Sequence, residues 1–194
     1  MFYLNIIMSY YGHIKKYLVI LFLGIVTIAC IQPVPRQPVT RMSSDLMKAS
    51  VNFNKKLNAL EENAIKRVIQ NDSLASYKAS SNGFWYKIDK KSDHSYFPKF
   101  GDKLEFQYEV FDLDYTVIYS AEEIGNQSYV VDQQEIQEGL RNGLKMMSQG
   151  DIVTFLFPSH KMFGYIGDEK KVGINQPLIY KVELNKIIKK NESD

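Results

Sequence analysis

Residues 135–158, EIQEGLRNGLKMMSQGDIVTFLFP, hold the change of pattern that decides the fold. In the part 135–147 the apolar residues recur at helical spacing, which predicts a short helix. Gly150 follows and tolerates the positive φ that a helix stop or the next turn requires. The run IVTFLF at 152–157 is apolar on both faces, as expected for a central strand covered on both sides, and Pro158 ends it. This stretch therefore predicts a short helix followed by a buried strand.

Segments with a period of two lie on both sides of this unit. Residues 84–88 are typical of a strand, 104–110 alternate apolar and polar side chains as a half-buried strand does, and 116–119 predict a shorter strand. Residues 178–184 alternate in the same way and predict a closing strand. Together with the central strand, these segments predict an α+β fold in which an antiparallel sheet wraps around one short helix.

A long amphipathic helix is predicted ahead of the sheet, over residues 43–70. Its apolar side chains recur mostly at steps of three and four residues, and neither glycine nor proline interrupts them. We assign residues 43–82 to this helix and its linker, 83–189 to the main domain and 190–194 to a polar tail. The helix can pack on the main domain, pair with a second copy or act as a spacer. Packing or pairing comes first, because its apolar stripe has area to bury.

The N-terminus has the pattern of a bacterial export signal, whether translation starts at Met1 or at Met8. The uncharged run 17–29, YLVILFLGIVTIA, follows two lysines and is shorter than the roughly 20 residues of a membrane span. The small residue directly before Cys30 resembles the lipobox of lipoproteins, in which the cysteine is acylated and becomes the first mature residue. We expect a signal peptide over 1–29 and a lipid on Cys30. The alternatives are an uncleaved anchor and a cysteine that is simply an apolar residue of the signal.

Charge and composition limit the partners of the mature chain. Residues 30–42 hold three of the six prolines and predict an extended tether. The chain has 24 basic and 22 acidic side chains, and Lys15 and Lys16 lie in the predicted signal, so the mature part has no formal net charge. We therefore expect no nucleic-acid partner and membrane attachment through the lipid alone. Ile31 is not an aspartate-type retention signal for the inner membrane, which favours the outer membrane, facing the periplasm.

No constellation for covalent or metal chemistry stands out in the sequence. The three histidines are scattered, and there is a single cysteine. Gly139 and Gly143 lie four residues apart on one helical face, a spacing that favours close packing of the helix on the sheet over phosphate binding. We expect no metal and no cofactor, so any catalysis must work through shape and hydrogen bonds.

Four motifs, taken together and in order, resemble the FKBP family of peptidyl-prolyl isomerases over roughly residues 83–188. The lipobox, the leading helix and the segment GINQPL at 173–178, taken together, resemble the gliding-motility-associated FKBP-like lipoproteins. The four motifs are GDKLEFQY at 101–108, the helix and its exit at 135–151, the Phe-Pro and Phe-Gly pairs within 157–164, and YKVEL at 180–184.

The resemblance implies a half-barrel sheet around the helix, an aromatic pocket for a prolyl segment, and cis-trans isomerisation of prolyl bonds. Rotation about such a bond is slow because amide resonance must be lost, which costs about 18–20 kcal/mol. A dry pocket that favours the twisted amide binds the transition state better than either planar state, and it needs no nucleophile.

Carried over position by position, the implied pocket departs from the family's pattern. The family's Phe-Asp pair stands here as Ile118-Tyr119, which removes the carboxylate and predicts an uncharged pocket. Gln137 stands where the family has an aliphatic residue that offers its backbone amide. These departures weaken the case for efficient isomerisation and for binding of immunosuppressant macrolides. The implied pocket residues are Tyr108, Ile118, Tyr119, Ile136, Gln137, Leu140, Phe163, Val172 and Tyr180.

Three functions remain open from the sequence. The first is a lipid-anchored isomerase that acts on proline-containing segments of envelope or secreted proteins, with a link to gliding motility. The second is a non-catalytic binding or chaperone lipoprotein that holds a component of a surface machine. The third is a structural lipoprotein with a vestigial groove. Self-association through the helix at 43–70 is compatible with each of them.

Overall fold

The structure is a computed structural model that describes residue 16, residues 40–72 and residues 75–192. Cys30 and, apart from residue 16, the predicted signal peptide lie outside the described residues. Within the described part, no helix is long and apolar enough to cross a membrane.

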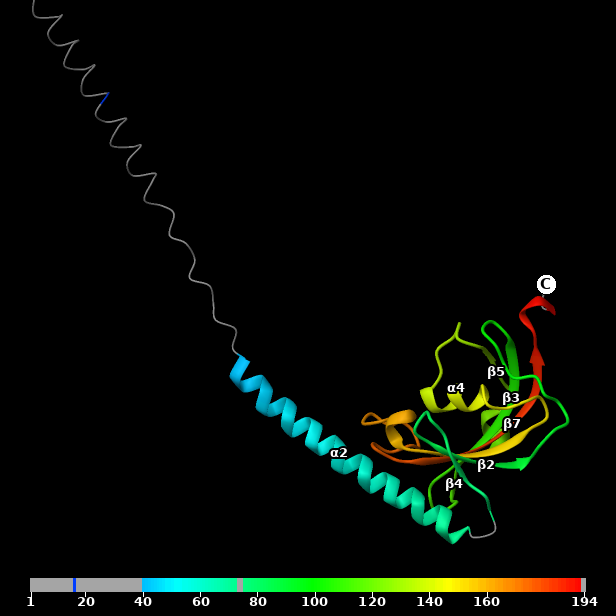
Figure 1. Cartoon of the computed structure of the whole chain (residues 1–194), viewed down its shortest axis with the longest axis horizontal. Coiled ribbons are helices and arrows are strands. Elements are labelled where there is room, and N and C mark those ends of the chain that lie inside the picture. The colour runs from blue at the N-terminus through cyan, green and yellow to red at the C-terminus, as the bar shows by residue number, and fades with distance from the viewer. Residues whose placement is uncertain (1–15, 17–39, 73–74, 193–194) are drawn as a thin grey trace, which may run out of the picture. The chain divides into compact units, whose positions relative to one another are not determined.

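The chain divides into two compact units, Met1–Leu46 and Met47–Asp194, and the second unit holds the sheet. All strand pairs of this seven-stranded sheet are antiparallel, and their order is β1-β2-β6-β7-β3-β4, with β5 also paired to β3. Figure 1 shows the sheet with helix α4 (Glu138–Leu144) beside it. The predicted antiparallel α+β architecture is therefore confirmed. The strands are β1 (Lys78–Ala79), β2 (Trp85–Lys90), β3 (Lys103–Phe111), β4 (Val117–Tyr119), β5 (Gln127–Val130), β6 (Ile152–Phe157) and β7 (Leu178–Ile188).

Strand β7 lies between β6 and β3 at the centre of the sheet, and its register places the aromatic side chains. Tyr108 of β3 is opposite Val182, and Val110 is opposite Tyr180, two residues away on each strand. Because side chains two residues apart share a face of a strand, Tyr108 and Tyr180 lie on the same face and meet diagonally.

Helix α4 (Glu138–Leu144) packs closely on one face of the sheet. A Cβ atom added to Gly139 would lie 2.8 Å from a ring carbon of Phe157, and one added to Gly143 would lie 3.0 Å from the ring of Phe155. The interpretation of these glycines as packing residues is confirmed. The helix is shorter than the predicted 135–147, because Gln137 has the non-helical N-cap conformation, with φ −54° and ψ 136°.

Helix α2 (Thr40–Asn71) covers the other face of the sheet with its C-terminal half. It begins three residues before the predicted 43, within the range expected as tether. Ile65 is fully buried against Leu156 of β6 and Ile179 of β7. The neighbouring residues of those two strands face α4 instead, which explains why β6 is apolar on both faces. Packing of the helix on the main domain is confirmed.

The domain also contains short elements that the sequence pattern did not reveal. They include β1 and β5, which have two and four residues, and the single helical turns α3 (Ala121–Ile124), η1 (Ser159–Lys161) and η2 (Lys190–Glu192). The predicted polar tail begins as η2 and is fixed to the domain, because Asp102 accepts the N–H of Lys190 at 3.1 Å. The same carboxylate, 3% exposed, also accepts hydrogen bonds from Tyr96 and Lys99. The Gly-Asp motif at 101–102 is thus a structural anchor.

Candidate functional site

Eight of the nine implied pocket residues belong to one hydrophobic cluster on the α4 side of the sheet. Three of them are buried and five are partly buried at the edge of the cluster, as expected for a site that opens to solvent. The buried residues are Leu140, Val172 and Tyr180, and the partly buried ones are Tyr108, Ile118, Tyr119, Ile136 and Phe163.

Stacked aromatic rings form the floor of this site. The rings of Tyr108 and Tyr180 stack with their centroids 5.2 Å apart and their planes at 17°. Phe157 meets the Tyr180 ring edge to face at 5.7 Å. Burial raises the pKa of the Tyr180 phenol far above its ordinary value, and it also raises the pKa of Tyr108. Both hydroxyls therefore stay protonated and can act as donors at physiological pH.

A carboxylate that the sequence did not reveal lies against the site. The hydroxyl of Tyr119 donates to Oδ2 of Asp168 at 2.5 Å, and Oδ1 of Asp168 accepts the N–H groups of Lys170 and Val172 at 2.9 and 2.8 Å. Burial alone would raise the pKa of Asp168, but the hydrogen bonds from Tyr119 and the amides outweigh it and lower that pKa. The hydrogen bond to Asp168 raises the pKa of Tyr119. The expectation of an uncharged pocket is corrected. The hydroxyl donor is Tyr119 of β4, and the carboxylate is Asp168 on the loop before β7.

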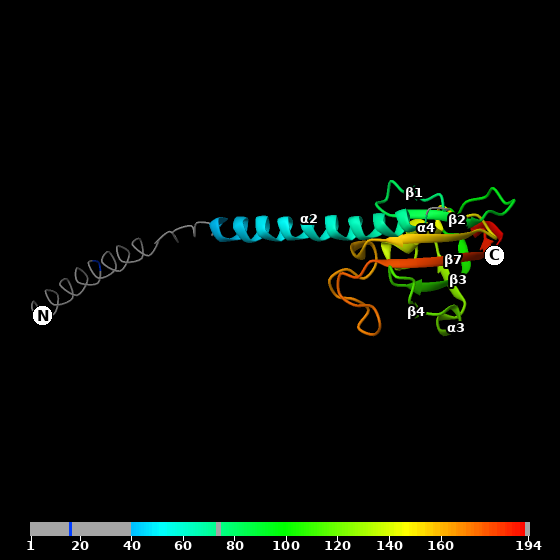
Figure 2. The same ribbon diagram turned by 90° about the horizontal axis from the view of Figure 1, so that it is seen from below.

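The loop that carries Asp168 is tied to the opposite side of the site. Lys171 pairs with Glu123 of α3 at 2.6 Å, and its Nζ lies 4.8 Å from the centroid of the Tyr119 ring. Figure 2 shows this loop on the same side of the domain as β4 and α3. The spacing of Asp168 and Val172 suits an aspartate that accepts the amides of its own turn. Nothing in the sequence pairs Asp168 with Tyr119, 49 residues away.

Gln137 lies outside the cluster, at the start of α4. Its carbonyl accepts the N–H of Arg141 at 3.0 Å, and its side chain makes no capping hydrogen bond. Within the described residues, the N–H of Gln137 has no backbone acceptor. This amide follows Ile136 in the chain, and Ile136 belongs to the cluster.

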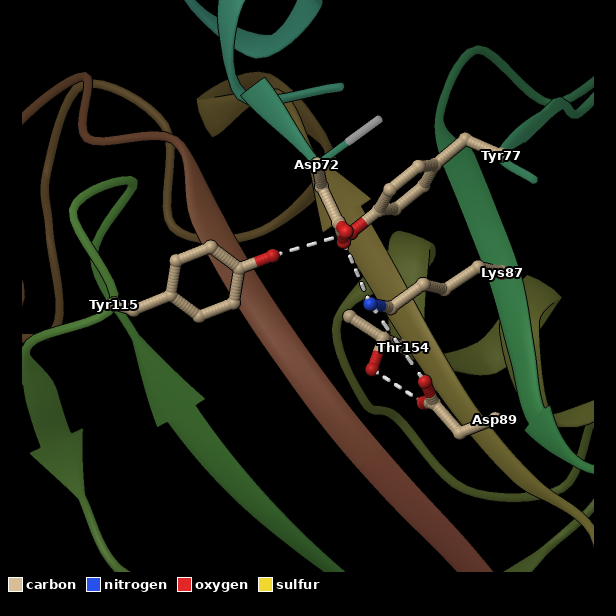
Figure 3. Close-up of polar contacts among 6 residues, drawn as sticks. All are labelled: Asp72, Tyr77, Lys87, Asp89, Tyr115 and Thr154. Carbon is tan, nitrogen blue, oxygen red and sulfur yellow. Dashed lines mark hydrogen bonds and ion pairs between the residues drawn. The ribbon is translucent and has the colours of Figure 1, made fainter. Parts of the chain in front are cut away.

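A second cluster of polar side chains lies on the α2 side of the sheet, around a cleft of about 770 Å³. Its carboxylate belongs to Asp72, the residue after the end of α2, and accepts hydrogen bonds from Lys87 at 2.8 Å and from the Tyr77 hydroxyl at 3.2 Å (Figure 3). The hydroxyls of Tyr77 and Tyr115 lie 3.1 Å apart. The hydrogen bond from Lys87 lowers the pKa of Asp72, with the positive charge of Lys87 acting in the same direction.

The rest of this network extends along β2 and β6. Lys87 also lies 3.8 Å from Asp89, whose other oxygen accepts the hydroxyl of Thr154 at 2.5 Å. The carboxylates are therefore paired internally, and the network fastens the end of α2 to β2 and to the turn between β3 and β4. Among the described residues, no three His, Cys, Asp or Glu side chains are grouped in a way that could hold a metal ion.

Comparison with known proteins agrees with this geometry. Residues 94–185 match the family of FKBP-type peptidyl-prolyl cis-trans isomerases. This part of the chain is similar to an FKBP domain. It is also similar to the probable FKBP-type peptidyl-prolyl cis-trans isomerase FkpA of Neisseria meningitidis serogroup B, with 28% identity over 142 residues. That match covers 72% of this chain and 48% of the relative, so the chain spans about half of the relative's length.

A solved structure has the same fold as the sheet and its short helix. The N-terminal domain of FKBP42 from Arabidopsis thaliana superposes with a TM-score of 0.53 at 16% identity, covering 59% of this chain and 94% of that domain. The predicted FKBP-like sheet wrapped around one short helix is therefore confirmed.

Proposed function

We propose that this protein catalyses cis-trans isomerisation of prolyl bonds in protein segments that bind at the cluster around Tyr108, Tyr180 and Asp168. The observation that carries the proposal is the convergence of eight implied pocket residues, together with an ionised carboxylate, on one face of an FKBP-like domain. In this proposal the stacked rings hold the proline, and the free N–H of Gln137 binds a carbonyl of the client chain.

The chemistry needs only a preference for the twisted amide. Twisting removes resonance, so the carbonyl oxygen of the prolyl bond carries less negative charge than in the planar state. The ionised Asp168 therefore disfavours the planar amide more than the twisted one, and a water-poor aromatic floor strengthens that difference. Each reduction of the barrier by about 1.4 kcal/mol accelerates rotation about tenfold.

Two alanine variants test the location of the site. Tyr108→Ala and Phe163→Ala are expected to lower kcat/KM for a proline-containing peptide at least about tenfold, because the first removes a ring of the floor and the second an aromatic wall. The matched control is Phe100→Ala, which removes an aromatic ring that is 60% exposed and outside the cluster. Unchanged activity in both site variants, with the fold intact by circular dichroism, would place the site elsewhere.

A second function, binding without turnover, is favoured by apolar side chains on the loop next to the site. Tyr165, Ile166 and Ile174 are 79%, 56% and 68% exposed. Such side chains can hold an unfolded client, and in a surface machine they would hold a component of it. Suppression of client aggregation with no acceleration of isomerisation would favour this function. A protein with neither property would have a vestigial groove.

We also propose that the protein is anchored in the cell envelope by a lipid on Cys30, in the outer membrane and facing the periplasm. The support is the lipobox-like sequence and the proline-rich tether that follows it. A Cys30→Ala variant should lose the mass of the lipid and move to the soluble fraction. The proposed link to gliding motility rests on the combined resemblance of the lipobox, the leading helix and the segment 173–178, and normal motility of cells carrying the Ala variant would argue against it.

Helix α2 offers a surface for self-association. Phe53 and Leu60, seven residues apart on one face of this helix, are 62% and 67% exposed, which is unusual for large apolar side chains of a monomer. We propose that a second copy covers them. Sedimentation should show a dimer that Phe53→Glu converts to a monomer, and a wild-type protein that stays monomeric at high concentration would contradict the proposal.

A further inference from the structure

A buried carboxylate joins the N-terminal helix to the segment that carries part of the site. Glu61 of α2 is 4% exposed, and Ser159 of η1 is 2% exposed. One carboxylate oxygen, Oε2, accepts the N–H of Ser159 at 2.8 Å, and Oε1 accepts its hydroxyl at 2.6 Å. Within the described residues, the Glu61 carboxylate has no cationic partner.

This contact is not needed for packing α2 on the sheet. Ile65, one helical turn later on the same face, already supplies the apolar contact with β6 and β7. An apolar residue at position 61 would extend that contact, whereas a buried carboxylate is costly unless its oxygens accept hydrogen bonds in a defined geometry. A buried Glu61 is therefore better explained by its hydrogen bonds, which fix the position of Ser159, than by packing.

Ser159 organises the segment between β6 and Gly164. Its carbonyl accepts the N–H groups of Met162 at 2.9 Å and Gly164 at 2.8 Å, which fold the chain around it. Phe163, an implied wall of the site, lies between these two residues. The other side of the turn is held by Lys161, whose Nζ lies 2.7 Å from Glu138 of α4. The segment is thus held by an ion pair with α4 and by hydrogen bonds with α2.

We infer that Glu61 is a positioning residue for the prolyl site: by holding Ser159 it fixes the turn that presents Phe163, so that helix α2 is part of the site's construction. The inference rests on the proposed function of that site. It makes the activity of the FKBP-like domain dependent on a helix that precedes the domain in the sequence.

The test uses the full chain with Glu61→Leu, which keeps the helix packed on the sheet but removes both acceptors. We expect kcat/KM to fall about tenfold, mainly through kcat, because the rings of Tyr108 and Tyr180 still bind the proline. Hydrogen exchange at the amides of Met162 and Gly164 should be faster than in wild type. The matched control is Glu62→Gln, because Glu62 is the adjacent carboxylate on the exposed side of α2.

A merely structural role gives a different result. In that case Glu61→Leu shifts the melting temperature but leaves kcat, KM and the exchange of these amides as in wild type, which overturns the inference. Ser159→Ala removes one of the two donors and answers the same question where Glu61→Leu does not fold. A wild-type protein without turnover contradicts the proposed function, and the exchange at Met162 and Gly164 still decides the role of Glu61.

Discussion

The Tyr119 hydroxyl and the Asp168 carboxylate form the polar edge of the candidate site. Each group is fixed twice: Tyr119 by its strand and by Lys171 over its ring, and Asp168 by Tyr119 and by the amides of its own loop. The carboxylate is thus held ionised next to aromatic rings whose hydroxyls stay protonated. This arrangement gives the site one fixed negative charge in an otherwise apolar surrounding.

Removing that charge should reduce catalysis while the fold is kept. We expect Asp168→Asn to lower kcat/KM for a proline peptide by about tenfold. The Asn oxygen can still accept the N–H groups of Lys170 and Val172, and its NH2 can donate to the Tyr119 hydroxyl, but the charge that disfavours the planar prolyl bond is gone. Glu169→Gln, a neighbouring exposed residue, is the matched control. Equal kinetics in the two variants would remove Asp168 from the mechanism.

The pH dependence of catalysis follows from the same pair. The folded-state pKa of Asp168 lies below its ordinary value of 3.8, so the carboxylate is charged at all higher pH. We expect kcat/KM to be constant from about pH 5 to 9 and to fall only as the pH drops through that lowered pKa. The raised pKa of Tyr119 adds no alkaline limb in this range. Circular dichroism at each pH separates this loss from acid unfolding, and a midpoint near 6 would contradict the assignment.

At the scale of elements, the contact of α4 with the sheet depends on Gly139 and Gly143. The space that a Cβ atom would have differs between these two positions. Alanine is favoured over glycine inside a helix by about 1 kcal/mol. At position 139, however, the new Cβ would come within 2.9 Å of both the Phe157 ring and Sδ of Met162, whereas at position 143 the nearest atom is 3.0 Å away. Overlap with a packed core costs about 1–3 kcal/mol, so it outweighs the helix preference at position 139.

We therefore expect Gly139→Ala to lower the free energy of unfolding by about 1–2 kcal/mol and Gly143→Ala to be near neutral. Asn142→Ala, on a less buried face of α4, should be neutral or slightly stabilising. Urea unfolding of the three variants measures the difference. A Gly139→Ala protein as stable as wild type would mean that α4 lies farther from β6 than described.

Sequence patterns predicted the elements whose signal is local and repeated. The alternation in β3 and β7, the two-sided apolar run of β6 and the helical stripe of α2 each extend over several residues, so the period identifies them. Strand β5 was missed because four residues give little period, and α4 was predicted too long because the conformation of Gln137 is not visible in its residue type.

The site was predicted less fully than the fold, for a physical reason. Its aromatic and aliphatic walls came from motifs that lie within single elements. The pairs Tyr119 with Asp168 and Glu61 with Ser159 join residues 49 and 98 positions apart. A single sequence shows such residues as ordinary polar side chains, because nothing local indicates which partner the fold brings to them.

In the whole molecule, the two faces of the sheet pack against different helices. The α4 face carries the candidate site, and the α2 face carries the helix whose Glu61 accepts hydrogen bonds from Ser159. The neutral formal charge of the predicted mature chain leaves client recognition to shape, apolar contact and hydrogen bonds. Clients would then be chosen for accessible proline segments, as in an unfolded or extended chain.

The most direct test of this account is the rate of cis-to-trans conversion of a proline-containing peptide in the presence of the purified protein. The uncatalysed reaction takes tens to hundreds of seconds at 25 °C, which is slow enough to follow in a protease-coupled assay. The account predicts an acceleration that is proportional to protein concentration and is reduced at least about tenfold in Tyr108→Ala. A conversion rate equal to the uncatalysed one at every protein concentration would contradict it.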